Sequence, residues 1–200
     1  MNAETAFSDQ LESWLQSEEP KTLGALGDVF GEKSFAVTIL FLMFVPALPL
    51  PTGGITHVFE AITVLLAAQM VLGRRTIWLP KRWQRRELGG MTTGKAVPFM
   101  IRRIRWFVRF SKPRWARLFQ QRWFLGLLGL VLMGFAIAAA FAPPFSGLDT
   151  LPSLGAVAVA LSIILEDVVV LAIGIAIGSG GIVLILTIGA ALVRVFRNLF

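Results

Sequence analysis

Two adjacent carboxylates in a long apolar stretch are the first residues of this sequence that could do chemistry. Glu166 and Asp167 stand among aliphatic residues, where an ionised carboxylate costs at least ~2.5–3.5 kcal/mol on membrane-insertion scales. Ser162 lies four residues before Glu166 and shares its helical face. The three side chains are candidates for a site that binds a proton, another small ion or a substrate. Alternatively, the acids mark an interfacial helix break, and the sequence favours neither interpretation.

A histidine and a glutamate form a second candidate pair earlier in the chain. His57 and Glu60 are three residues apart, so they can hydrogen-bond on one face of a helix and relay a proton. They follow a turn rich in proline and glycine by only a few residues, which favours an interfacial position instead. Gln69, in apolar surroundings, is expected to satisfy a polar group of a neighbouring helix.

Catalytic motifs are absent from the sequence. It has no cysteine and one histidine, which argues against thiolate metal sites and histidine-based catalysis. It also has no paired-glycine nucleotide fingerprint, no Walker loop and no Ser/His/Asp constellation, and no segment remains for a nucleotide-sugar domain. We therefore expect a protein that is not an enzyme and that binds neither a metal nor a cofactor.

The composition is that of a membrane protein. Of the 200 residues, 56% are hydrophobic and only 16% are charged, against about 25% charged residues in soluble domains. The mean hydropathy is +0.73. A soluble domain of this size could not bury so much apolar surface. We expect an all-α integral membrane protein.

Charge is distributed unevenly along the chain. Residues 74–122 hold fifteen Lys or Arg and one acid, whereas residues 1–33 hold seven acids and two lysines. Because apolar stretches flank the basic segment, it is predicted to face anionic lipid rather than nucleic acid. The positive-inside rule places it in the cytoplasm.

Two amphipathic segments are predicted outside the apolar stretches. Residues 98–110 have an apolar face opposite Arg102, Arg105 and Arg109, which is typical of an interfacial helix that contacts lipid headgroups. The alternative is a solvated basic face packed on the protein's own core. Residues 5–16 read as a short amphipathic helix in an acidic N-terminal segment that lacks the pattern of a signal peptide.

Four to five hydrophobic segments are expected, at residues 35–45, 55–73, 124–142, 153–178 and 181–197. The first reaches only about half of a ~30 Å hydrocarbon core and is expected to re-enter. The glycine-rich run at 178–181 is expected to separate the last two. Gly174 and Gly178 have the spacing of closely packed membrane helices, within the chain first and in a homodimer second. The predicted regions are 1–33, 34–73, 74–122 and 123–200.

An internal repeat relates the two apolar regions. Aligning Pro46 with Pro143 aligns Gln69 with Glu166, and in each half an apolar helix enters a proline-rich turn before a second helix with a polar residue near its end. Duplicated helix-turn-helix units with kinked, re-entrant helices are typical of transporters. Alternatively, the prolines simply end helices at membrane boundaries. The prolines of these turns are Pro46, Pro49, Pro51, Pro143, Pro144 and Pro152.

Several short motifs resemble the ExoD family of bacterial exopolysaccharide-synthesis membrane proteins over roughly residues 22–190. They are Gly31-Glu32-Lys33-Ser34-Phe35, Gln69-x-x-x-Gly73-Arg74-Arg75-x-x-Trp78-Leu79-Pro80, Lys112-Pro113-Arg114 and Asp167. The sequence departs from the family pattern at Val108, Asp149 and Val168. The resemblance implies the bacterial inner membrane and a role in exopolysaccharide production, and it supplies no catalytic residues.

Two functions agree with these features. In the first, a small integral membrane protein moves or positions a small ion or a lipid-linked glycan. In the second, a non-transporting accessory or scaffold subunit recruits partners or anionic lipid through its basic surface. The expected partners are anionic lipid, a second copy of the chain and the polysaccharide-synthesis machinery.

Overall fold

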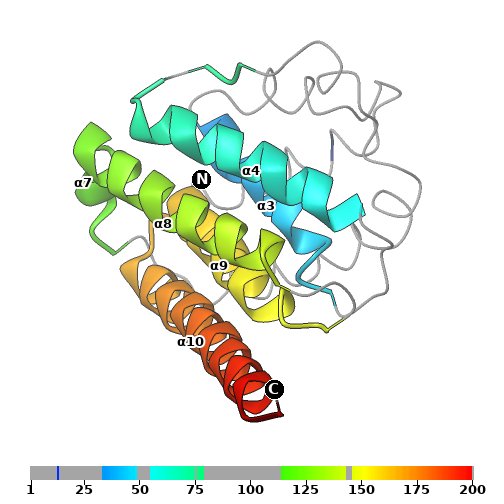
Figure 1. Cartoon of the computed structure of the whole chain (residues 1–200). Helices are drawn as coiled ribbons and strands as arrows, with labels where there is room; N and C mark the ends of the chain where they lie inside the picture. Colours follow the sequence, from blue (N-terminus) through cyan, green and yellow to red (C-terminus); the bar gives the residue numbers. More distant parts are fainter. Residues whose placement is uncertain are drawn as a thin grey trace.

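The computed structural model describes residues 13, 33–48, 55–74, 76–78, 114–142 and 146–199. Within these residues the chain forms six α-helices and no strands (Figure 1), which confirms an all-α fold for this part of the protein. The helices are α3 (Ser34–Phe44), α4 (Ile55–Val71), α7 (Ala116–Phe119), α8 (Arg122–Ala140), α9 (Thr150–Leu165) and α10 (Val168–Leu199).

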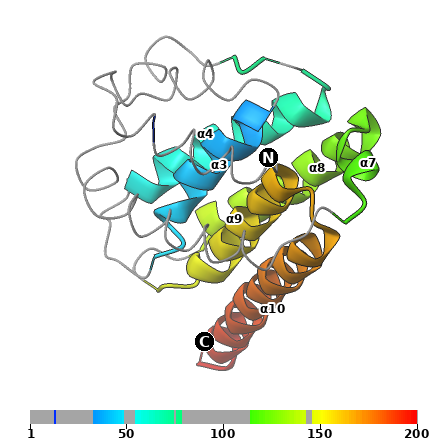
Figure 2. The ribbon, with the colours of Figure 1, turned by 180° about the vertical axis from the view of Figure 1, so that it is seen from behind.

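The longer helices pack in pairs. Helix α4 lies along α8, α3 lies along α9, and α10 lies along the other side of α9 (Figures 1 and 2). In the predicted repeat, α3 corresponds to α8 and α4 corresponds to α9. The α4–α8 pair therefore corresponds to the α9–α3 pair. This is the pairing that a two-fold repeat would produce, so it agrees with the repeat seen in the sequence. The repeat itself stays a prediction.

Helix α3 is buried along its whole length, and among the described helices it packs mainly on α9 and α4. All eleven of its residues are buried, which fits a segment that is apolar on every side and contains only Ser34 and Thr38 as polar residues. Its length comes from the uninterrupted apolar run that ends at Pro46, which lies in the turn after the helix. Polar side chains of α4 and α9 that face this buried helix are therefore kept away from water.

Two helices, α8 and α10, are long and apolar enough to cross a membrane. Only about a third of the residues in each apolar window is buried, 33% in α8 and 28% in α10. Large side chains such as Leu130, Ile137 and Leu186 are exposed on their outer faces. A core helix of a soluble protein would be covered, whereas outward-facing apolar surface suits contact with lipid.

Glycines set the closest approaches between helices. A methyl group on Gly155 of α9 would overlap the backbone of Gly178 in α10, and one on Gly174 would lie 2.9 Å from the nitrogen of Val159. Gly129 of α8 approaches Ala67 and Met70 of α4 in the same way. The small-residue spacing at Gly174 and Gly178 therefore serves packing within the chain.

The predicted division of the last apolar region is wrong. Helix α10 continues through residues 178–181, and the chain instead leaves helical geometry at Glu166 and Asp167. The glycines of that run do not break the helix, because close packing on α9 holds Gly178 and Gly181 in place. Pro152 also causes no kink, since it lies in the first turn of α9, where a proline removes no helical hydrogen bond.

Several predicted features lie outside the described residues. These are Pro49, Pro51, Pro143, Pro144, the 98–110 helix with Arg102, Arg105 and Arg109, and all but residue 13 of the N-terminal helix.

Candidate functional site

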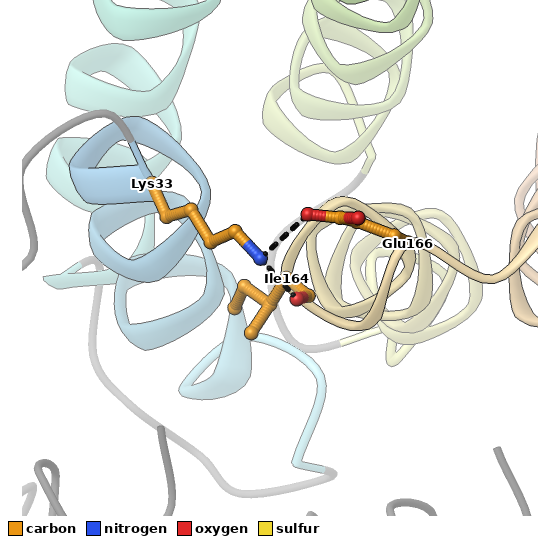
Figure 3. A network of polar contacts seen from close by, with 3 residues as sticks. All are labelled: Lys33, Ile164 and Glu166. Atoms are coloured by element: carbon orange, nitrogen blue, oxygen red, sulfur yellow. Dashed lines mark hydrogen bonds and ion pairs between the residues drawn. The ribbon is translucent and has the colours of Figure 1, made fainter. Parts of the chain in front are cut away.

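Glu166 forms the junction between α9 and α10. Its backbone adopts the left-handed conformation, with φ of 54°, which is unfavourable for a residue with a Cβ. Lys33, immediately before α3, holds the side chain in place: its Nζ lies 2.9 Å from Glu166 Oε1 and donates a hydrogen bond to the carbonyl of Ile164 (Figure 3). This ion pair fastens the start of α3 to the end of α9.

Asp167 is the N-cap of α10. Its side chain is 1% exposed, and its Oδ1 accepts a hydrogen bond of 2.9 Å from the backbone N–H of Val169. Its Oδ2 lies 3.6 Å from Arg114 Nη1. A carboxylate at this position satisfies a free N–H group and interacts favourably with the helix dipole. The structure thus gives Asp167 a structural role.

Replacing Asp167 by alanine is expected to lower the free energy of unfolding by about 1 kcal/mol, because the N-cap is lost. Asp167→Asn retains the hydrogen-bond acceptor and should cost less. Thermal unfolding of the two purified variants in detergent measures the difference. Equal loss of stability in both would show that the charge, through Arg114, matters more than the cap.

Ser162 does not reach Glu166. Its Oγ is buried and donates a hydrogen bond of 2.7 Å to the carbonyl of Val159 in its own helix. Its carbonyl accepts the N–H of Asp167 at 3.2 Å, which helps to end α9. The three residues that the sequence grouped are neighbours, but their side chains point to different partners.

Gln69 fastens the chain that leaves α4. Its Nε2 donates to the carbonyl of Trp78 at 2.8 Å, and its Oε1 accepts the N–H of Trp78 at 2.7 Å. Gln69 therefore pairs with the backbone of Trp78, in the segment that follows α4, and not with a polar group of a neighbouring helix as the sequence predicted.

The pair of His57 and Glu60 lies near the start of α4. His57 Nδ1 and Glu60 Oε2 are 2.8 Å apart, and the Glu60 side chain is completely buried whereas that of His57 is 44% exposed. The second carboxyl oxygen of Glu60 has no hydrogen-bond partner among the described residues. A buried carboxyl group is thus joined to solvent through one imidazole ring.

Three helices, α3, α4 and α9, each carry a buried hydroxyl group that has no hydrogen-bond partner among the described residues. The Oγ1 atoms of Thr38 in α3 and Thr63 in α4, and the Oγ of Ser153 in α9, are buried without a partner in the described part of the chain. Buried polar atoms are rarely left unpaired. Asp149, which immediately precedes α9, is the charged group besides His57 that influences Glu60 among the residues that the structure describes. The interior of the bundle is therefore polar near the starts of α4 and α9.

The opposite end of the bundle is basic. The start of α8 lies beside the end of α4, since Gly126 is next to Val71, and Glu166 ends α9 at the start of α3. The basic residues at this end are Lys33, Arg74, Arg114, Arg117 and Arg122. Trp78, Trp115 and Trp123 are exposed there, as tryptophans are where a protein meets the headgroup region of a membrane.

A family model described as "Exopolysaccharide synthesis, ExoD" matches residues 7–187. The chain belongs to the ExoD family. Membership implies a role in exopolysaccharide synthesis. An uncharacterized protein of Synechocystis is 29% identical over 157 residues, which cover 74% of this chain and 70% of the relative. No solved structure matches the chain.

Sequence reasoning missed several polar residues of this ExoD protein. Lys33, Arg74 and Arg122 meet at the basic end although they are distant in sequence, and no local pattern predicts such a meeting. Thr38 and Thr63 each stand alone within an apolar run, and an isolated polar residue in such a run is the signal that could have found them.

Proposed function

We propose that this ExoD protein is an integral inner-membrane protein that moves a small cation, a proton in the simplest case, during exopolysaccharide synthesis. One observation carries the proposal: Glu60 is completely buried among apolar helices, and its hydrogen-bonded partner His57 is half exposed. Ionisable residues inside membrane helices are expensive and generally mark ion pathways or proton relays.

The pair has the chemistry for proton exchange. A carboxyl group binds and releases a proton, and an imidazole exchanges protons in the physiological pH range. His57 would pass the proton between water and Glu60 Oε2. The Oε1 atom of Glu60 and the hydroxyls of Thr38 and Thr63, which have no hydrogen-bond partner among the described residues, supply further oxygen atoms inside the bundle. The surrounding charges are few. Helix α3 has none, Arg122 of α8 lies at the opposite end, and of the other charged residues that the structure describes only Asp149 is near Glu60.

The proposed orientation places the basic end in the cytoplasm. The segment 74–122 is far more basic than any other loop, and the bias of Lys and Arg sets orientation in membranes. A reporter fused after Gly90 is expected to be active in its cytoplasmic form and inactive in its periplasmic form. In this orientation His57, at the other end of the bundle, faces the outer side. The reverse result of the reporter experiment would overturn this orientation.

The proposal is tested with purified protein in liposomes that contain a pH-sensitive dye. A potassium diffusion potential, negative inside, should drive proton uptake above that of protein-free liposomes. Uptake equal to that of protein-free liposomes would contradict the proposal and favour the accessory-subunit function, in which the basic surface recruits partners or anionic lipid.

A lipid-linked glycan is the second candidate for what the protein moves or positions. The observation that favours it is a basic cavity at the end of the bundle remote from Glu60, lined by Lys33, Arg74 and Arg122.

A further inference from the structure

The basic end of the bundle contains a cavity of about 250 Å³. It lies where α3 and α8 begin and where α4 and α9 end. Its polar lining includes Lys33, Arg74, Arg122 and Glu166, and its apolar lining includes Phe35 and Leu125. A cavity of this size, lined by both basic and apolar side chains, suits the charged end of an amphipathic ligand.

The lining has an excess of positive charge. Lys33 is paired with Glu166, so these two charges offset each other. Arg74 and Arg122 are exposed and form no ion pair with any described residue. Guanidinium groups bind phosphate through two parallel hydrogen bonds. The cavity therefore presents two guanidinium groups that are available for an anion.

Helix geometry adds to the positive potential. Phe35 and Ala36 from the first turn of α3, and Arg122 from the first turn of α8, line the cavity. Neither helix has a side chain capping its first turn. The first N–H groups of a helix have no partner within the helix, and together with the helix dipole they favour an anion. Two helix starts without a side-chain cap thus converge on one cavity with two arginines that form no ion pair in the described part of the chain.

The position of the cavity points to a ligand at the membrane surface. Trp78, Trp115 and Trp123 are exposed at the same end of the bundle, at the level expected for headgroups. The apolar residues of the lining are Phe35, Met70, Phe119, Leu125 and Ile163. A free anion gains no favourable contact from apolar side chains, whereas the first methylene groups of a lipid can pack against them.

We propose that this cavity binds an anionic phosphate group, carried by a membrane lipid, between Arg74, Arg122 and the first turns of α3 and α8. The inference goes beyond proton movement through Glu60 and does not depend on it, because the cavity is at the other end of the bundle. The same chemistry would accept free phosphate, and the experiment separates the two sources.

The experiment measures lipid retained by the purified full chain in native mass spectrometry. The probes are phosphatidic acid and phosphatidylglycerol, compared with phosphatidylcholine, whose headgroup is neutral overall. We expect Arg122→Gln to weaken retention of the anionic lipids about fivefold, and Arg74→Gln with Arg122→Gln about tenfold or more. Retention of phosphatidylcholine, in which the choline cation offsets the charge of the phosphate, should change much less.

Arg117→Gln is the matched control, since Arg117 is exposed at the same end and does not line the cavity. It should retain anionic lipid like the parent. If it loses as much as Arg122→Gln, or if the double variant retains lipid like the parent, the proposal is overturned. Thermal unfolding of each variant checks that the fold is intact.

Inorganic phosphate distinguishes the sources of the phosphate group. If it displaces no lipid when compared with chloride at equal ionic strength, the ligand is a lipid. If it displaces the lipid, and itself protects the parent but not the double variant against unfolding, the cavity binds free phosphate. The first result supports the proposal as stated. The second supports a phosphate site formed by the two arginines and overturns its lipid source.

Discussion

Replacing Glu60 by glutamine is expected to reduce proton uptake into liposomes to the level of protein-free liposomes. The amide has nearly the same shape and keeps a hydrogen bond to His57, but it cannot bind and release a proton. It also avoids burying a charge, so expression and thermal stability should be retained. Proton uptake and thermal unfolding of the same preparation separate loss of transport from loss of fold.

Two controls sharpen this test. Glu166→Gln should retain uptake, because Glu166 is at the basic end, is partly exposed and is paired with Lys33. His57→Gln should slow uptake without abolishing it, since it removes the group that connects Glu60 with water and leaves the carboxyl group. If Glu60→Gln takes up protons like the parent, Glu60 is not the carrier and its burial serves the fold.

The largest effect on stability is expected at the crossing of α9 and α10. Gly155→Ala places a methyl group that overlaps Gly178 Cα and lies 2.7 Å from its nitrogen. Both contacts are with backbone atoms, so the helices must separate. Overpacking of this kind costs about 1–3 kcal/mol, and the α9–α10 contact is the most extensive between helices of the bundle. We expect a loss near the upper end of that range.

Gly180→Ala is the matched control for this prediction. The same methyl group at Gly180 meets nothing within 4 Å, and alanine favours a helix by up to about 1 kcal/mol over glycine. The same substitution should therefore destabilise at residue 155 and stabilise at residue 180. Thermal unfolding in one detergent compares them directly, and equal midpoints would mean that the crossing is looser than the structure has it.

The approximate bounds of α3, α4 and α8 could be predicted from the sequence because the lengths of these helices follow from uninterrupted apolar runs. The predicted segment 35–45 corresponds to helix Ser34–Phe44, and the predicted segment 124–142 corresponds to helix Arg122–Ala140. The boundary between α9 and α10 was missed because glycine breaks isolated helices, whereas here Gly178 is needed for the approach of α9. A glycine that permits contact and a glycine that ends a helix look the same in one sequence.

The two polar sites could be predicted only in part. The spacing of His57 and Glu60 indicated a hydrogen-bonded pair, but the burial of Glu60 depends on the helices packed around α4. Glu166 and Asp167 were predicted as a candidate site because adjacent acids are rare in an apolar sequence. In the structure they lie at the junction between two helices. The basic cavity draws on four separate segments, so local patterns could not reveal it.

The shortness of α3 has an electrical consequence. Eleven residues of helix extend about 16 Å, roughly half of a ~30 Å hydrocarbon core. If water reaches both ends of this buried helix, the transmembrane voltage falls mainly across that short distance instead of across the whole bilayer. The field there would be about twice its usual strength, while the total work on one charge, about 2.3 kcal/mol per 100 mV, is unchanged. A proton on Glu60 would then sense most of the membrane voltage within a few helical turns.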